Sequence, residues 1–417
     1  MSGARFFYTA LLYALLPQAL LHLWWRARRQ PAYLEHIAER FGRYAQPRAK
    51  RLLWVHAVSV GETRAAAPLI EALRHGYPEH EILLTHMTPT GRETGVALFG
   101  ESVQRAYLPY DFPFAVERFL DHFKPECGIL LETEIWPNLI HACVGRRLPV
   151  YLVNARMSEK SRRRYARFPT LAAITLNELS AIAAQSQADA ERLQALGAKR
   201  VTVTGSLKFD IAPDAGLLKQ GANWREQWGR ARPVLLCAST REGEETLLLA
   251  ALKLIDVPNL LTLVVPRHPQ RFDTVAGEIE RAGFRYQRRS AGRTVTADTQ
   301  IVLGDSMGEM FAYYAACDVA IIGGSLLPYG GQNLIEASAV GRAVIIGPHT
   351  FNFADATRQA VAAGAALQVT DAREAMTAAQ GLLRDSARAQ RMAQAGLVFT
   401  RKQEGATRRV MALLDLQ

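Results

Sequence analysis

The sequence is short of the residues and motifs that mark several common enzyme classes. Only four of its 417 residues are cysteines, at positions 127, 143, 237 and 317, and no two of them form a C-x-x-C pair. This spacing is typical of buried free thiols in a reducing compartment and argues against a disulfide framework or a zinc site. No G-x-G-x-x-G or G-x-x-x-x-G-K segment occurs, so the dinucleotide and P-loop fingerprints are missing. D-x-D and H-E-x-x-H are also absent, and we expect neither a metal nor a cofactor.

The composition is that of a globular protein with an excess of positive charge. Apolar residues make up 49% of the chain, and its length is enough for two domains with separate cores. The formal net charge is +11, which favours an anionic partner such as nucleic acid, a phospholipid surface or a phosphorylated substrate. Charge alone does not choose among these partners.

An apolar segment near the N-terminus is long enough to cross a bilayer. Residues 6–25 read FFYTALLYALLPQALLHLWW, and arginines follow at positions 26, 28, 29, 40 and 43. About 20 apolar residues span the hydrocarbon core, and flanking arginines keep their side of the segment in the cytoplasm. We therefore expect residues 1–30 to attach the protein to the cytoplasmic face of a membrane, either spanning it or lying on it. Pro17, Gln18 and His22 leave open a third interpretation, a buried amphipathic helix.

From Leu52 onward, short apolar runs alternate with segments of helical period. Strands are expected at LLWVHAVS, EILLTHMT, VQRAYLPY, CGILLET, PVYLVNAR, AIAAQS and VTVTG, and then, after a polar stretch, at PVLLCAS, LLTLVVPR, TQIVLGD, VAIIGGS and AVIIGP. Runs of valine, isoleucine and leucine without alternation are typical of parallel strands, which are buried on both faces. The pattern predicts an α/β fold with two doubly wound sheets, in lobes at 31–205 and 206–417 that face one cleft.

Acidic residues lie where the first and fourth expected strands end, which is where ligands bind in such sheets. Glu62 falls in the first turn of a helix, where it can complement the helix dipole or act as a general base. His56 is a competing base, although a packed core histidine is the plainer interpretation. Glu132 and Glu134 would share a face if they continued the strand, and they belong either to a site or to a capped loop.

Two basic features also have more than one interpretation. Lys208 lies at the joint between the two series of strands, either as a solvated linker residue or as a cation beside a departing phosphate. The segment SEKSRRRYARF carries Arg162, Arg163, Arg164 and Arg167 with aromatic residues beside them. It is either a solvated basic helix or a contact for acidic lipid headgroups. No nucleic-acid motif accompanies it, and we expect no nucleic-acid partner.

The second series of strands ends in residues suited to phosphate and nucleotide. Arg267 follows a strand, where a guanidinium can bind phosphate bidentately. The turn after the expected strand TQIVLGD has two interpretations. It either offers backbone amides to a ligand or contains a helix cap formed by Asp305 or Ser306. The segment VAIIGGSLLPYGGQNLIEASAVG is the strongest local signal. Free amides from Asn333 to Ile335 would form an anion site at the start of a helix.

The chain resembles the 3-deoxy-D-manno-octulosonic acid (Kdo) transferases in a series of motifs from the N-terminal apolar segment to about Phe351. The matching segments are WVHAVSVGE, HMTPTGRE, LPYDFP, LETEIWPN, NARMS, GSLKFD, VPRHPQRF, GDSMGEM, GGSLLPYGGQN and GPHTFNF. This resemblance implies a GT-B glycosyltransferase that acts in lipopolysaccharide core biosynthesis at the inner membrane. The C-terminal lobe would bind the donor CMP-Kdo, and the N-terminal lobe would hold a lipid A precursor, lipid IVA. Transfer would be inverting and independent of metal.

The resemblance also implies roles for individual residues. Glu62 would deprotonate the acceptor hydroxyl, and Glu132 and Lys208 would stabilise the transition state. Gln332 stands where the family often has histidine, and since backbone amides do most of the work there, we expect donor binding to survive. The residues that would contact CMP are Pro266, Arg267, Met307, Gly308, Glu309, Asn333, Leu334, Ile335 and Glu336.

Two other functions stay open at this point. One is a sugar-nucleotide epimerase of the same fold that acts on a soluble substrate, and the other is a non-catalytic, membrane-bound sugar-nucleotide binder. The N-terminal apolar segment and the arginines at 162–167 argue against the first, because a soluble substrate needs neither. A sugar-nucleotide that is bound but never consumed would favour the second.

Overall fold

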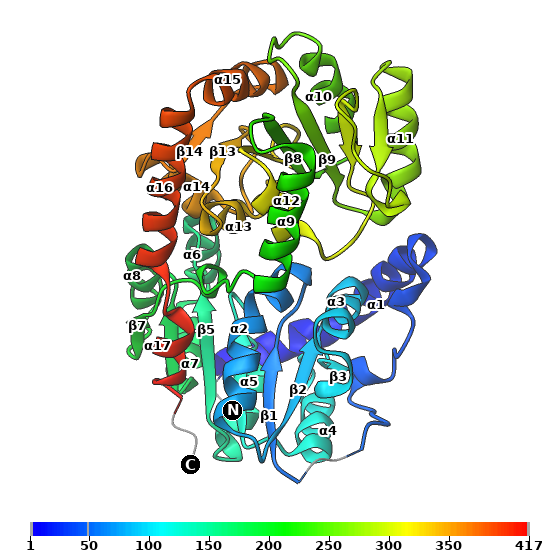
Figure 1. Cartoon of the computed structure of the whole chain (residues 1–417). Coiled ribbons are helices and arrows are strands. Elements are labelled where there is room, and N and C mark those ends of the chain that lie inside the picture. The colour runs from blue at the N-terminus through cyan, green and yellow to red at the C-terminus, as the bar shows by residue number, and fades with distance from the viewer. Residues whose placement is uncertain (1–2, 48–49, 415–417) are drawn as a thin grey trace. The chain divides into compact units, whose positions relative to one another are not determined.

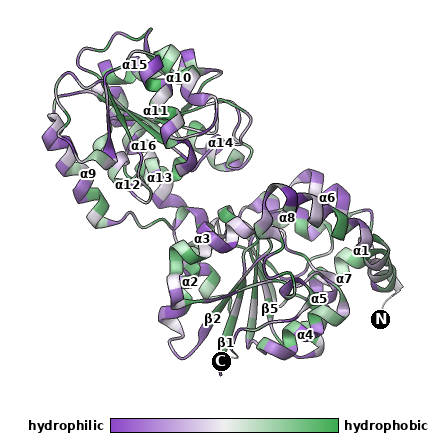
Figure 2. Ribbon diagram, turned by 90° about the vertical axis from the view of Figure 1, so that its right-hand side faces the viewer, coloured by the Kyte–Doolittle hydropathy of each residue, from purple (hydrophilic) through white to green (hydrophobic). Residues whose placement is uncertain are grey.

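The computed structural model describes residues 3–47 and 50–414, and the chain divides into two compact units (Figure 1). Unit 1 consists of residues 1–210 with 404–417, and unit 2 consists of residues 211–403. Each unit is built on one seven-stranded sheet in which every pairing is parallel. Helices cover both faces of the sheet in each unit (Figure 2). The predicted α/β fold with two doubly wound parallel sheets is therefore confirmed.

The sheet of unit 1 has the strand order β3-β2-β1-β4-β5-β6-β7. Chain order reverses between β1 and β4, and ligands bind at such a switch point in doubly wound sheets. The strands are β1 (Leu52–His56), β2 (Glu81–His86), β3 (Gln104–Tyr107), β4 (Cys127–Leu131), β5 (Val150–Ala155), β6 (Ala181–Ala184) and β7 (Val201–Val203). The helices are α1 (Gly3–Arg29), η1 (Pro31–Tyr33), η2 (Glu39–Phe41), α2 (Val60–Gly76), α3 (Pro89–Phe99), η3 (Gly100–Ser102), α4 (Pro113–Phe123), α5 (Pro137–Gly145), α6 (Glu159–Tyr165), α7 (Pro169–Glu178), α8 (Gln187–Ala195), η4 (Leu207–Phe209) and α17 (Ala406–Met411).

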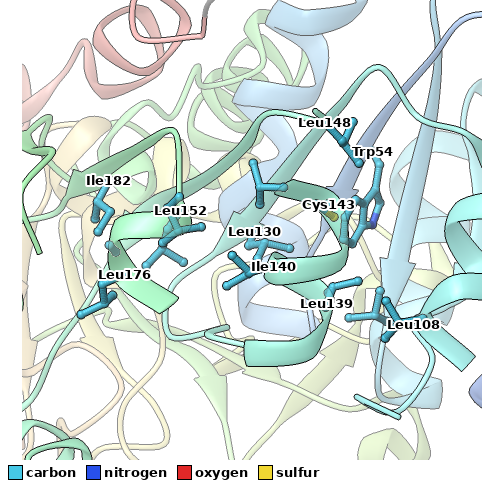
Figure 3. Packing of buried hydrophobic residues seen from close by; sticks show 14 of the residues in the cluster. Trp54, Leu108, Leu130, Leu139, Ile140, Cys143, Leu148, Leu152, Leu176 and Ile182 are labelled. Carbon is cyan, nitrogen blue, oxygen red and sulfur yellow. The ribbon is translucent and has the colours of Figure 1, made fainter. Parts of the chain in front are cut away.

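Helix α5 is fixed to this sheet by its apolar face. Leu139, Ile140 and Cys143 are buried and point toward Trp54 of β1 and Leu130 of β4 (Figure 3). Burying a leucine or isoleucine side chain stabilises a fold by about 1.5–3 kcal/mol, so the position of α5 against the strands is firmly set. The start of α5 therefore provides a rigid edge beside the carboxyl end of β4.

The sheet of unit 2 has the strand order β10-β11-β9-β8-β12-β13-β14, with its switch point between β8 and β12. Sequence reasoning missed β10 and β14, which are edge strands of only three residues; the side chains of β10 are half-exposed, and those of β14 range from buried to exposed. The strands are β8 (Val234–Thr240), β9 (Leu261–Pro266), β10 (Tyr286–Arg288), β11 (Ile301–Leu303), β12 (Val319–Ile322), β13 (Ala343–Ile346) and β14 (Ala366–Gln368). The helices are α9 (Ala215–Trp228), α10 (Glu244–Leu252), η5 (Pro269–Arg271), α11 (Phe272–Arg281), η6 (Arg289–Ala291), α12 (Met310–Ala316), α13 (Leu334–Ala339), α14 (Ala354–Ala362), α15 (Ala372–Arg384) and α16 (Ser386–Gln403).

The end of the chain belongs to unit 1, although the sequence places it with the second series of strands. Asp210 accepts hydrogen bonds from the backbone N–H groups of Gly405 (2.6 Å) and Thr407 at the start of α17. Ala406 and Val410 of that helix are buried in the apolar cluster on the α2 side of the sheet. Unit 2 is therefore an insertion between Asp210 and Glu404.

Helix α1 carries the apolar N-terminal segment. It is the one helix in the described part of the chain that is long and apolar enough to cross a membrane, and only 11% of its most apolar window is buried. Phe7 and Leu21 are 74% and 67% exposed. A buried core helix therefore does not describe α1, and its exposed apolar surface is consistent with attachment to a membrane. The four cysteines, in contrast, are buried free thiols as predicted.

Candidate active site

The acidic residues singled out in the sequence lie together at the switch point of unit 1. Glu62 stands in the first turn of α2, just after β1, and Glu132 and Glu134 stand in the connection from β4 to α5. Because β1 and β4 are neighbouring parallel strands, their carboxyl ends bring the two connections side by side. Sequence reasoning therefore located this cluster of carboxylates.

The Glu62 side chain turns back toward the end of β1. Its carboxylate accepts hydrogen bonds from the backbone N–H of Val58 (2.8 Å) and the hydroxyl of Ser59 (3.0 Å). Burial, together with repulsion from Glu132 and Glu134, raises the pKa of Glu62 to about 8 against these two bonds. The side chain thus closes the turn that leads from β1 into α2, as a structural carboxylate would, and also has the basicity that suits proton abstraction near neutral pH.

Glu132 is paired with Lys208. The Nζ atom of Lys208 lies 3.3 Å from Oε1 of Glu132, and about a fifth of each side chain is exposed. Glu132 does not continue β4: it has a left-handed backbone with φ of 57°, and its N–H donates to the carbonyl of Val153 (3.0 Å). A non-glycine residue held in this region is a local strain of a kind that clusters at functional sites.

Glu134 faces a different set of groups from Glu132. The indole Nε1 of Trp136 donates to Oε2 of Glu134 (2.8 Å), and Nε2 of His56 lies 3.7 Å from the same oxygen. Of the two arrangements that the sequence left open, the shared strand face is not found, because β4 ends at Leu131 and a turn follows. His56 is fully buried, and its Nδ1 contacts the hydroxyl of Thr85 (2.9 Å). It is a core histidine with one nitrogen directed at Glu134.

Sequence reasoning missed Asn154, which positions Lys208. Asn154 lies at an irregularity in the pairing of β5 with β6, is fully buried and has φ of 51°. Its Oδ1 accepts a hydrogen bond from the N–H of Leu207 (3.1 Å) in η4, the short helix that carries Lys208. The available signal was a polar residue near the carboxyl end of an otherwise apolar strand.

Sequence reasoning also missed Glu244, which joins the two loops at the switch point of unit 2. This buried carboxylate accepts hydrogen bonds from the N–H groups of Arg241 (2.8 Å), Gly324 (2.6 Å) and Leu326 (2.9 Å). Arg241 follows β8, and the other two residues belong to the glycine-rich loop after β12. A buried charged group is stable when hydrogen bonds saturate it, so Glu244 fixes the path of that loop.

The glycine-rich loop ends in a helix that is capped from within. The side chain of Asn333 accepts a hydrogen bond from the N–H of Ile335 (3.0 Å), and its Nδ2 donates to Glu336 (3.1 Å). The expectation of free amides from Asn333 to Ile335 is therefore wrong at Ile335, since the cap occupies that amide. Gly330 and Gly331 have φ of 93° and 76°, a conformation that other residues rarely adopt.

The remaining predicted donor residues lie on neighbouring strand ends of unit 2. Pro266 ends β9, and the N–H of Arg267 donates to the carbonyl of Thr240 (2.9 Å). Gly308 has φ of 83° in the turn before α12, and Met307 is 52% exposed. Glu309, rather than Asp305 or Ser306, is the cap residue of α12. Its carboxylate accepts hydrogen bonds from Gln220 (2.5 Å), Arg289 (2.9 Å) and Ser306.

Most of the basic segment of the sequence forms helix α6, and Arg167 lies in the turn that follows it. Glu159 pairs with Arg162 (2.7 Å) and Arg163 (3.1 Å). A hollow of about 540 Å³ is lined by Glu159, Lys160, Arg163, Arg164 and Arg167. The helix is therefore an exposed cationic surface, as both interpretations of the sequence require.

Comparisons with known proteins agree with the fold and with the motif series. A family model described as 3-deoxy-D-manno-octulosonic-acid transferase matches residues 35–211. The 3-deoxy-D-manno-octulosonic acid transferase of Bordetella pertussis is 47% identical, and that of Haemophilus influenzae is 38% identical; each alignment covers 98% of both chains. Among solved structures, the UDP-GlcNAc 2-epimerase of Neisseria meningitidis bound to UDP-GlcNAc superposes with a TM-score of 0.59 at 15% identity, over 87% of this chain and 99% of that one. This likeness shows the two-lobed fold, and the full-length sequence identities show that the chain belongs to the Kdo transferase family.

Proposed function

We propose that this Kdo transferase moves Kdo from CMP-Kdo to a hydroxyl of a lipid A precursor, lipid IVA, at the cytoplasmic face of the inner membrane, and that it needs no metal. The observation that carries the proposal is the group of Glu62, Glu132, Glu134 and Lys208 at the switch point of unit 1. This group supplies a base and a cation without a cofactor. Its position beyond the strand ends is where an acceptor can reach it.

Glu62 is the proposed general base. Its ionised carboxylate takes the proton from the acceptor hydroxyl while that oxygen forms a bond to the anomeric carbon of Kdo. The bond from this carbon to the phosphate oxygen breaks, and CMP leaves with the electron pair. Attack from the face opposite CMP inverts the anomeric centre. The raised pKa of about 8 makes Glu62 a stronger base than an ordinary carboxylate, at the expense of the fraction ionised at neutral pH.

Glu132 and Lys208 are the proposed stabilisers of the transition state. The ammonium group of Lys208 offsets negative charge that develops on the departing phosphate, and Glu132 offsets positive charge on the sugar. Their separation of 3.3 Å orients the two side chains toward each other before substrate arrives. Asn154 then acts as a positioning residue through its bond to Leu207 (3.1 Å).

Unit 2 is the proposed donor-binding unit. Arg267 supplies a guanidinium for the phosphate of CMP, and the loop held by Glu244 supplies backbone groups beside it. Glu336 and Glu309 are acceptors for hydroxyl or amino groups of the nucleotide. Pro266, Met307, Gly308, Asn333, Leu334 and Ile335 complete the proposed contact surface, which retains Gln332 in place of histidine.

The exposed surfaces of unit 1 support a lipid-linked acceptor. Apolar side chains on α1 are largely exposed, and the cations of α6 suit phosphate groups of a lipid or of the acceptor itself. Residues 1–30 would then hold the protein on the membrane where the acceptor resides. A soluble substrate would need neither surface.

The direct test is mass spectrometry of the product made by the purified protein from CMP-Kdo and tetra-acylated lipid A precursor in detergent. We expect the acceptor mass to rise by one or more Kdo units, in the presence of EDTA as in its absence. Loss of product with EDTA, restored by one divalent cation, would overturn the claim of metal independence. An unchanged acceptor mass with CMP-Kdo intact would overturn the proposed reaction.

A further inference from the structure

The first turns of α1 are joined to unit 1 by polar contacts, which is unusual for an apolar membrane-attachment segment. The hydroxyl of Tyr8 donates to Oδ2 of Asp111 (2.9 Å), and the hydroxyl of Thr9 donates to Oδ1 of Asn138 (3.0 Å). Arg5 is 7% exposed and lies 4.0 Å from Glu178. Polar groups buried in this way must keep their partners, so this end of the helix is part of the folded unit.

Asp111 connects α1 to the start of α5. Its Oδ1 accepts the N–H of Leu139 (2.8 Å), its Oδ2 accepts the N–H of Asn138 (3.0 Å), and its carbonyl accepts Nδ2 of Asn138 (2.8 Å). Trp136, the residue at the cap position of α5, provides no side-chain cap of its own. Asp111 is therefore the N-terminal cap of α5, supplied by the loop between β3 and α4. Asp111 and Asn138 are 3% and 6% exposed.

The start of α5 is directly connected to the carboxylate group. Trp136 precedes the helix and donates to Glu134 (2.8 Å), and Glu134 faces His56 (3.7 Å) and contributes to the raised pKa of Glu62. A displacement of the α5 terminus would move Trp136 and with it Glu134. Displacements of about 1 Å at groups remote from the chemistry can lower turnover about a hundredfold.

We propose that Tyr8 and Asp111 are positioning residues for the transfer reaction, which fix the start of α5 and through it Trp136 and Glu134. The inference rests on the proposed function of the carboxylate group. It makes the beginning of α1 a structural part of the acceptor site, in addition to its role in attachment. The contact pairs residues 103 positions apart in the chain, so it depends on the completed fold of unit 1.

The test compares Tyr8→Phe with Tyr13→Phe in the full chain. Tyr13 lies on the same helix and packs its ring on Phe112 with centroids 5.1 Å apart, and its hydroxyl has no hydrogen bond among the described residues. We expect Tyr8→Phe to lower kcat about tenfold at saturating lipid IVA in detergent, with the KM for CMP-Kdo and sedimentation with anionic phospholipid vesicles unchanged. The acid-side midpoint of kcat/KM should also shift, because a displaced Glu134 would change its repulsion of Glu62. Tyr13→Phe should match the wild type in every measurement.

Hydrogen exchange of the same variants separates this inference from the proposed reaction. Amides in residues 132–139 should exchange about tenfold faster in Tyr8→Phe than in the wild type, because opening at the α5 terminus becomes easier. Asp111→Asn should show the same change more strongly, since the carboxylate cap is lost. Unchanged exchange in this segment, wild-type kcat in Tyr8→Phe, or an equal loss in Tyr13→Phe would each overturn the inference. A wild-type protein without transferase activity would overturn the proposed function. The exchange data would still decide whether Tyr8 and Asp111 fix the start of α5.

Discussion

Lys208 and Glu132 form an ion pair of 3.3 Å between η4 and the turn that follows β4. Three carboxylates meet in this part of unit 1, and this pair provides one of them with a counter-charge. Glu62 takes part in no ion pair among the described residues and is held by Val58 and Ser59. Glu134 is held by Trp136 and faces His56 rather than a lysine or arginine. The roles of Glu62 and Glu134 in the reaction should therefore be separable by single substitutions.

Replacement of Glu62 tests the general base. We expect Glu62→Gln and Glu62→Ala to lower kcat roughly a hundred- to ten-thousand-fold, because proton abstraction from the acceptor hydroxyl is lost. A radiolabelled transfer assay measures this, with far-ultraviolet circular dichroism to show that the variants are folded. Turnover within a factor of two of the wild type would contradict the assignment.

The raised pKa of Glu62 predicts a particular pH profile. Since the base must be ionised, kcat/KM of the wild type should rise with pH through a midpoint of about 8.

The raised pKa of Glu62 also predicts how stability depends on pH. A carboxyl whose folded pKa lies above its unfolded value contributes stability below about pH 4.5, and this contribution is lost as pH rises through 8. Urea denaturation should show that Glu62→Gln loses less stability than the wild type between pH 5 and pH 9. A parallel pH dependence for the two proteins would be inconsistent with the shift.

Replacement of Lys208 tests whether its ammonium group stabilises the transition state. Lys208→Ala should lower kcat about a hundredfold at saturating donor, since a preorganised charge beside the leaving group is removed. Lys199→Ala is the matched control, because Lys199 is exposed in the same unit and lies outside the site. Steady-state kinetics with both variants decide the matter, and an unchanged kcat for Lys208→Ala would remove its proposed role.

Glu244 and Glu245 allow a test of whether the glycine-rich loop of unit 2 binds the donor. Glu244→Gln should weaken CMP binding about ten- to a hundredfold, the effect of losing hydrogen bonds to a buried charge worth ~1.5–3 kcal/mol. Glu245 is equally buried but binds Thr240 (2.9 Å) and Arg271 (3.1 Å) instead of the loop. Glu245→Gln should therefore lower the unfolding temperature and leave the dissociation constant for CMP unchanged in isothermal titration calorimetry. Equal affinities for CMP in the two variants would show that Glu244 does not organise the site.

Much of the fold and part of the site could be predicted from the sequence, for a definite physical reason. Strands such as β1 and β4 are buried on both faces, so they appear as continuous apolar runs, and Glu62 and Glu132 stand out because they interrupt that pattern at the strand ends. The edge strands β10 and β14 carry no such signal, because each has only three residues and, apart from the buried Ala366, their side chains are half-exposed or exposed.

The contacts that organise the site could not be predicted from the sequence. Asn154, Glu244 and Asp111 act through backbone N–H groups of distant segments, and a backbone group has no signature in the residue type. The amide of Ile335 was misjudged for a related reason: whether Asn333 caps its own helix or leaves the amides open depends on its rotamer, which the sequence does not specify.

The insertion of unit 2 between Asp210 and Glu404 has a consequence for biosynthesis. A ribosome completes unit 2 as one continuous stretch, whereas unit 1 lacks Ala406 and Val410 from its core until unit 2 has been translated. If the sheet of unit 1 forms before then, the apolar surface that Ala406 and Val410 cover stays exposed during the synthesis of about 190 residues. Its burial follows only when Asp210 caps the last helix.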